Sequence, residues 1–286
     1  MSEFTMPTER YFDWALKPAS STLFDIHERP NGQFCVVLNH SLLRGVTSEM
    51  IHWWFLHFPN LRVTLDDVPG YESQAVAGYL LWHPSDHCSA KLSGRLGPNG
   101  QSRAGASIQI QEAMQYKTYG LKYPVNTSLK IFYCGPDGWA MGKALPFFGK
   151  VMCLRIHFKD VIEAGEIIGV HYHYEVVIGT SGNSPIARAL NSKITSDYSP
   201  EFFAAWQLHN TIEVGTFENF LPVLFAQRGD LSSLYYARSM NPMIGVGDHQ
   251  SAQSPSLFDK RLAGYKSTKD PFAYQGAEQA SFVGAI

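Results

Sequence analysis

The spacing of hydrophobic residues changes along the chain from strand-like to helical. Apolar and polar residues alternate in ASIQIQEAM (106–114), as in a strand with one buried face. The runs VMCLRIHF (151–158) and EIIGVHYHYEVVIG (166–179) are also strand-like and lie close enough in sequence to predict a hairpin. After Ser199 and Pro200, which are typical of a helix start, a stripe with helical spacing contains Phe202, Trp206, His209, Glu213, Phe217 and Phe220. We expect this long helix to pass Gly215 and to kink or end at Pro222.

A shorter helix is predicted in GVTSEMIHWWFLHF (45–58), which starts at Thr47 and Ser48 and stops before Pro59. Several antiparallel strands followed by one long helix predict an α+β fold. In this helix-grip (Bet v 1-like) arrangement, a curved antiparallel sheet wraps around the long C-terminal helix and leaves a cavity for an apolar small molecule.

Three parts of the chain are expected. Residues 1–70 form an N-terminal extension with a helix, and residues 71–228 form the helix-grip catalytic domain. Residues 229–286 are polar and show little periodicity, which predicts a C-terminal arm.

Composition and charge narrow the class of protein. The 286 residues carry a formal net charge of −2, so no basic field indicates a nucleic-acid or membrane partner. The first residues do not have the pattern of a signal peptide, and the four cysteines have no CxxC spacing. We therefore expect a cytoplasmic protein with free thiols, and leave open whether it forms a homodimer.

The candidate chemistry begins with two ionisable residues inside the apolar helical stripe. His209 and Glu213 are four residues apart, so both can reach one metal ion, although this spacing also occurs by chance. Glu112 falls on the apolar side of its strand, where a carboxylate without a partner is costly. WHPSDH (82–87) adds His83 and His87 around a proline turn, with Asp86 between them. Two histidines and two glutamates from separate elements suit zinc, and also other divalent ions.

Taken together, GVTSEMIHWWF, YLLWHPSDH, Glu112 and HNTIE resemble the 2,4-diacetylphloroglucinol hydrolases and the related phloretin hydrolase. The resemblance spans residues 45–228. It implies a helix-grip fold with one Zn²⁺ per chain, held by His83, Glu112, His209 and Glu213. It also implies hydrolysis of the carbon–carbon bond between an acyl group and a phloroglucinol-type ring. The absence of a GxSxG sequence agrees with a metal-dependent route.

The resemblance also implies which residues contact the substrate, a small aromatic ketone or polyphenol. Asp86 stands where the family has an asparagine, which replaces a neutral donor with a charged acceptor. Tyr172 is matched to a tyrosine that binds the phenol, and His157 lies on the partner strand. Asp86, His87 or a tyrosine is expected to return a proton to the ring carbon.

Two other classes of function stay open at this point. A cyclase or isomerase of polyketide metabolism could use the same scaffold without hydrolysis. A binding protein for an apolar ligand would need no metal at all. Release of a free carboxylic acid from an acylated phloroglucinol would distinguish a hydrolase from both.

Overall fold

The computed structural model describes residues 4–229, apart from residues 11, 13, 15, 66–74 and 197, together with the short strand 235–236. Within these residues, nine strands form one antiparallel sheet in the order β1-β2-β11-β10-β9-β8-β7-β6, with β3 paired to β11. Its strands are β1 (Thr22–Glu28), β2 (Phe34–His40), β3 (Leu43–Arg44), β6 (His87–Ser93), β7 (Ser107–Ala113), β8 (Pro124–Gly135), β9 (Gly138–Leu145), β10 (Gly149–Glu163) and β11 (Glu166–Ile178). A small second sheet contains β4 (Arg62–Leu65), β5 (Ala75–Ala77) and β12 (Tyr235–Tyr236).

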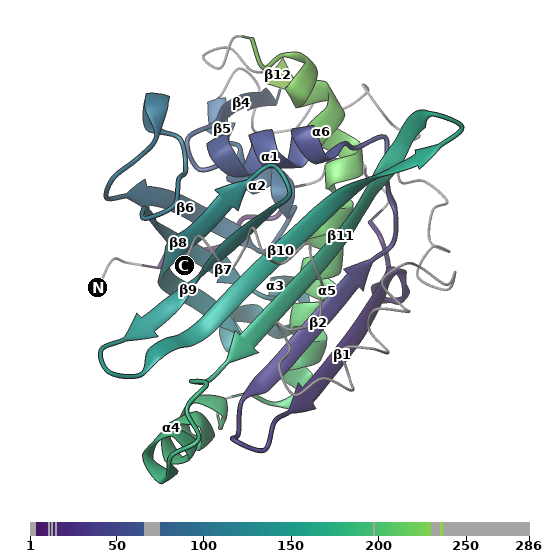
Figure 1. Cartoon of the computed structure of the whole chain (residues 1–286). Helices are drawn as coiled ribbons and strands as arrows, with labels where there is room; N and C mark the ends of the chain where they lie inside the picture. The colour runs from purple at the N-terminus through teal and green to yellow at the C-terminus, as the bar shows by residue number, and fades with distance from the viewer. Residues whose placement is uncertain are drawn as a thin grey trace.

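The helices lie mainly behind the large sheet in the view of Figure 1. The longest is α5 (Pro200–Gly215), which continues into α6 (Phe217–Ala226). The other helical segments are α1 (Ser48–His57), α2 (Tyr79–Trp82), α3 (Tyr116–Tyr119), α4 (Pro185–Thr195) and three 3₁₀ turns, η1 (Ala19–Ser21), η2 (Pro98–Gly100) and η3 (Gly120–Lys122). The expected α+β helix-grip fold is therefore confirmed.

The local signals in the sequence explain most of these boundaries. The Thr47 hydroxyl caps α1 by accepting a hydrogen bond from the Met50 N–H at 3.3 Å. The Ser199 hydroxyl caps α5 in the same way, accepting from the Phe202 N–H at 3.1 Å. The predicted strand at 106–114 is β7, and the predicted hairpin is the β10–β11 pair.

One expectation about the long helix needs correction. It does not run unbroken to Phe220, because α5 ends at Gly215 and a new helix, α6, starts at Phe217. The Thr216 hydroxyl lies at the junction, 2.7 Å from the Glu213 carbonyl oxygen and 2.8 Å from the Trp82 carbonyl oxygen. The second contact joins the helix junction to the turn that carries His83 and His87.

The expected division of the chain can be compared with these elements. The expected boundary at residue 70 falls in 66–74, outside the described residues, as does almost all of the expected arm 229–286. The strands β1, β2 and β3 of the N-terminal part lie in the same sheet as β6–β11. No helix in the described part of the chain is long and apolar enough to span a membrane.

A candidate metal centre in an aromatic cavity

Helix α5 places two of the predicted ligands on its buried face. His209 is 2% exposed, and Glu213, one helical turn further on, is 8% exposed. Together with Phe202, Trp206 and Asn210 they face a cavity between α5 and the sheet. The helix therefore presents an imidazole and a carboxylate to one point.

The turn between α2 and β6 carries two histidines, and its conformation places one of them next to the carboxylates of Glu112 and Glu213. Strand β6 begins at His87, which pairs in register with Glu112 of β7. The Nδ1 atom of His87 lies 2.9 Å from the Tyr79 carbonyl oxygen and so carries the proton, because a carbonyl can only accept. The Nε2 atom lies 3.5 Å from Glu213 Oε1 and 3.9 Å from Glu112 Oε1.

Donor atoms of three residues converge at this place, and Glu213 Oε1 adjoins one of them, His87 Nε2. His209 Nε2 is 3.5 Å from Glu112 Oε2, and single ligand atoms of His87, Glu112 and His209 all lie within 4.8 Å of one another. The buried Nε2 atom of His87 has no hydrogen-bond partner. A buried polar nitrogen without a hydrogen-bond partner is costly, and a metal ion held between it and the carboxylates would remove that cost, so the set of donors fits a metal ion.

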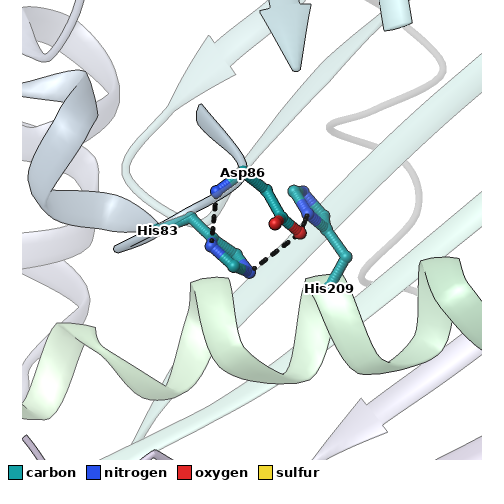
Figure 2. Close-up of side chains that lie close together, drawn as sticks. All are labelled: His83, Asp86 and His209. Atoms are coloured by element: carbon teal, nitrogen blue, oxygen red, sulfur yellow. Dashed lines mark hydrogen bonds and ion pairs between the residues drawn. The ribbon is translucent and has the colours of Figure 1, made fainter. Parts of the chain in front are cut away.

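His83 lies beside Asp86 and His209 (Figure 2). Its Nδ1 atom accepts from the backbone N–H groups of Ser85 at 3.3 Å and Asp86 at 3.1 Å. Its Nε2 atom is 3.3 Å from Asp86 Oδ2, and its ring stacks on the His209 ring with 4.6 Å between centroids. Burial lowers the pKa of His83 well below its ordinary value, despite the nearby carboxylate, so this imidazole is neutral. The structure thus brings His87, and not His83, to Glu112 and Glu213.

Asp86 is fully buried and holds His209 in place. Its Oδ2 atom lies 2.9 Å from His209 Nδ1 (Figure 2). The same carboxylate accepts from the N–H groups of Gln115 at 2.7 Å and Tyr116 at 3.1 Å, and from the Ser85 hydroxyl at 3.1 Å. Burial alone would raise the pKa of Asp86, but the histidines and the N–H donors outweigh it and hold the pKa well below its usual range.

The charge on Asp86 acts in turn on His209. Burial alone would lower the pKa of His209, but the hydrogen bond to Asp86 and the charges of Glu112, Asp86 and Glu213 raise it to about 9. Because Nδ1 faces Asp86, the proton lost on metal binding is the one on Nε2, which faces Glu112. Asp86 thus sets the tautomer that a metal ligand needs.

Each glutamate of the site is also held by a neighbour that sequence reasoning did not identify. The Tyr79 hydroxyl donates to Glu112 Oε1, and the Asn210 amide donates to Glu213 Oε2 at 3.0 Å. The Asn210 amide oxygen is 2.9 Å from His40 Nε2, and burial lowers the pKa of His40 to about 3, so His40 is a neutral donor. Asn210 follows His209 directly, but Tyr79 and His40 become neighbours only through the fold.

The cavity in front of the donors has a volume of about 410 Å³. Its walls are mainly aromatic and aliphatic, and its lining includes Glu112, His209 and Glu213 beside Tyr79, Trp82, Tyr172, Tyr174, Trp206, Met141 and Met152. Burial, together with the charge of Glu213, raises the pKa of Tyr172 and of Tyr174 well above the ordinary value, so both remain hydroxyl donors. The volume is ample for an aromatic ring with an attached acyl group.

The four residues expected to contact the substrate differ in position. Tyr172 lines the cavity, as expected, whereas Asp86 and His87 are buried behind its wall. His157 pairs with His173, one position from the Phe158–Tyr172 pair, and therefore points to the opposite face of the sheet. Strand alternation thus separates His157 from the cavity.

Comparisons with known proteins were made for fold and for family. The crystal structure of Ara h 8.0201 aligns with 68% of this chain and 100% of its own, at 11% sequence identity and a TM-score of 0.33. A comparison with curated proteins gave no significant match. The sequence model of the family described as DAPG hydrolase PhiG domain matches residues 24–118, a range that includes His83, Asp86, His87 and Glu112. The resemblance to that family is thus confirmed over residues 24–118.

Proposed function

We propose that this protein is a metal-dependent hydrolase that cleaves the carbon–carbon bond between an acyl group and a phloroglucinol-type ring. The observation that carries the proposal is the buried Nε2 atom of His87, which faces Glu112 and Glu213 without a hydrogen-bond partner. The family match supports a hydrolase acting on phloroglucinol-like substrates. The cavity beside the donors supports an aromatic substrate.

In this proposal one Zn²⁺ per chain is held by His87, Glu112, His209 and Glu213. His87 replaces His83 in the set that the sequence suggested, because the lone pair of His83 Nδ1 is already engaged by two backbone N–H groups. When bound, zinc would polarise the ketone oxygen and favour deprotonation of water. The carboxylates of Glu112 and Glu213 are kept in place by Tyr79 and Asn210.

The chain's own residues would then orient the substrate and move a proton. The aromatic walls hold the ring, and Tyr172 offers a hydroxyl that stays protonated at neutral pH. Water adds to the acyl carbon, and the bond between that carbon and the ring breaks. Its electron pair goes to the ring carbon, where the phenol oxygens delocalise it. That carbon takes a proton, for which Tyr172 is the donor we propose, the proton that water releases restores the Tyr172 hydroxyl, and the acyl group leaves as a carboxylic acid.

The experiment is an assay of the purified chain against a panel of acyl-phloroglucinols, with zinc measured by elemental analysis. We expect about one zinc per chain and release of a free carboxylic acid, which a cyclase, an isomerase or a binding protein would not produce. His87→Ala should lose the metal and reduce turnover at least roughly a hundredfold, since a ligand is removed.

His83→Ala is the matched control, because it removes a neighbouring buried imidazole and should keep its zinc. Circular dichroism verifies that both variants are folded. Full zinc content and full turnover in His87→Ala would exclude this metal site. A wild-type protein that binds zinc but releases no acid from any compound would exclude the reaction and leave the metal site standing.

A further inference from the structure

The turn between β9 and β10 exposes large apolar side chains. Phe147 is 105% exposed and lies at a positive φ of 67°, while Leu145 and Phe148 are 42% and 36% exposed. The turn is nevertheless anchored, because the Thr180 hydroxyl donates to the Phe148 carbonyl at 2.8 Å. An aromatic residue held in water by a fixed turn in an unfavourable conformation indicates a contact surface.

The charged side chains on the two segments that form this surface are all basic. Residues 138–153 include Lys143 and Lys150 and have no acidic residue. Residues 179–196, which Thr180 links to the turn and which include α4, carry Arg188 and Lys193 and likewise have no acidic residue. These two segments are therefore basic although the chain as a whole has a net charge of −2. We call Leu145, Phe147, Phe148 and these four cations the basic apolar tip.

The basic apolar tip lies at the edge of the substrate cavity. Lys143 is exposed and lines the cavity, and it pairs with Met152, another lining residue, on β10. Tyr198 and Phe202, which come just after α4, complete the lining at the same end. A surface that contacts the basic apolar tip would thus lie next to the cavity residues at this end of the molecule.

The opposite end of the sheet provides a contrast. The β10–β11 turn also exposes apolar side chains, with Ile162 at 64% and Ile167 at 47%. Here the neighbours are Glu163 and Glu166, which an anionic surface would repel. Figure 1 shows the two hairpin turns at opposite ends of the sheet, and of the two only the β9–β10 turn, residues 145–149, lacks acidic residues.

We propose that the basic apolar tip docks onto an anionic lipid surface, with Phe147 and Phe148 at the boundary between headgroups and acyl chains. Exposed aromatics between lysines match such a boundary, where apolar burial and attraction to anionic headgroups add. This departs from the sequence-based expectation of no membrane partner. It extends the proposed function, because apolar acylated rings partition into lipid and would reach the cavity directly.

The test is co-sedimentation of the full chain with vesicles of phosphatidylglycerol and of phosphatidylcholine. We expect binding to the anionic vesicles, weaker at high salt, and little binding to the neutral ones. Phe147→Ser should lower the partition coefficient roughly tenfold, and Lys150→Gln or Arg188→Gln about fivefold each. None of these three residues lines the cavity, so turnover of a dissolved substrate should stay at the wild-type level.

Ile162→Ser is the matched control, since it removes an exposed apolar side chain from the acidic turn and should leave vesicle binding unchanged. The proposal would be overturned if Ile162→Ser and Phe147→Ser reduced vesicle binding equally. It would also be overturned if the wild type did not bind anionic vesicles. A shift from dimer to monomer in Phe147→Ser, without vesicle binding by the wild type, would assign the tip to self-association. Vesicle binding requires no turnover, so its failure is distinct from failure of the proposed reaction.

Discussion

The surroundings of Asp86 suit a residue that positions His209 better than the substrate contact expected from the sequence. Its carboxylate is not on the cavity wall and instead joins His209 Nδ1 to the backbone N–H groups of Gln115 and Tyr116. Every neighbour of this carboxylate is a donor. An ionised aspartate satisfies all of them, whereas an amide would turn one donor toward another donor.

We therefore predict that Asp86→Asn weakens zinc binding by roughly tenfold to a hundredfold, since partners of this kind usually contribute that much. Competition against a chelator of known affinity measures the change. Ser85→Ala is the control, because it removes only one of the donors to Asp86 and should change the affinity little. Unchanged affinity in Asp86→Asn would show that Asp86 does not orient His209.

The sequence predicted three of the four proposed ligands. It indicated His83 in place of the fourth, His87, and the cause lies in the local structure around these two histidines. Glu112, His209 and Glu213 lie on regular elements, where spacing tells which way a side chain points. His83 and His87 flank a turn, and a turn has no such period. The decisive fact is the pairing of His87 with Glu112 between β6 and β7. That pairing could have been proposed from the alternation in β7, but not from WHPSDH alone.

Among the elements, the junction of α5 and α6 connects the helical ligands with the turn before β6. The Thr216 hydroxyl lies 2.8 Å from the Trp82 carbonyl oxygen, and Trp82 directly precedes His83. The Trp82 ring also stacks on Phe217 with 5.4 Å between centroids. Ligands from two parts of the chain are thus fixed relative to each other by contacts outside the metal centre.

Thr216→Val keeps the shape of the side chain and removes its hydroxyl. We predict a loss of about 1–2 kcal/mol in the free energy of unfolding, because a buried carbonyl loses its donor. Urea denaturation monitored by tryptophan fluorescence gives this value. Thr216→Ser retains the hydroxyl and should recover most of the loss; equal destabilisation by Val and Ser would instead indicate a packing effect.

The elements that the sequence predicted best are those with strong local signals. Capped starts gave α1 and α5, and alternation gave β7 and the β10–β11 hairpin. Strand order was not predictable, because β2 pairs with β11, far away in sequence, and nothing in a single strand specifies its neighbour. The break at Thr216 was missed because helical spacing continues through it.

At the scale of the whole molecule, the N-terminal segment is tied to the C-terminal helix by a buried ion pair. Lys17 Nζ lies 2.7 Å from Glu218 Oε1, and these side chains are 3% and 0% exposed. Lys17 also donates to the Ser41 hydroxyl and the Leu42 carbonyl, and Glu218 accepts from the Arg44 N–H. The first residues of the chain thus contribute to the same core as α6.

We predict that Lys17→Met lowers the free energy of unfolding by about 3–5 kcal/mol, since it leaves a carboxylate buried without its cation. Thermal unfolding followed by circular dichroism would show the change. The double variant with Glu218→Leu should be more stable than Lys17→Met alone. If the double variant is less stable than Lys17→Met, the unpaired Glu218 carboxylate is not the cause of the lower free energy of unfolding.

Charge illustrates a limit of whole-chain averages. The net charge of −2 led to the expectation of no membrane partner, yet segments 138–153 and 179–196, which a hydrogen bond joins, carry four cations and no acidic residue. A sum over the chain contains no information about which side chains end up adjacent. The strand pairing of β9 with β10 and the hydrogen bond from Thr180 provide that information.

The four proposed zinc ligands come in two pairs, one at the β6–β7 edge of the sheet and one on α5, far apart in sequence. A shared ion would therefore act as a removable cross-link between the two ends of the domain. An ion that binds only the folded chain stabilises it by about 2.7 kcal/mol at a free concentration one hundred times its dissociation constant. The amount of folded protein in a cell would then follow the supply of metal, so that scarcity would reduce the quantity of enzyme as well as its occupancy.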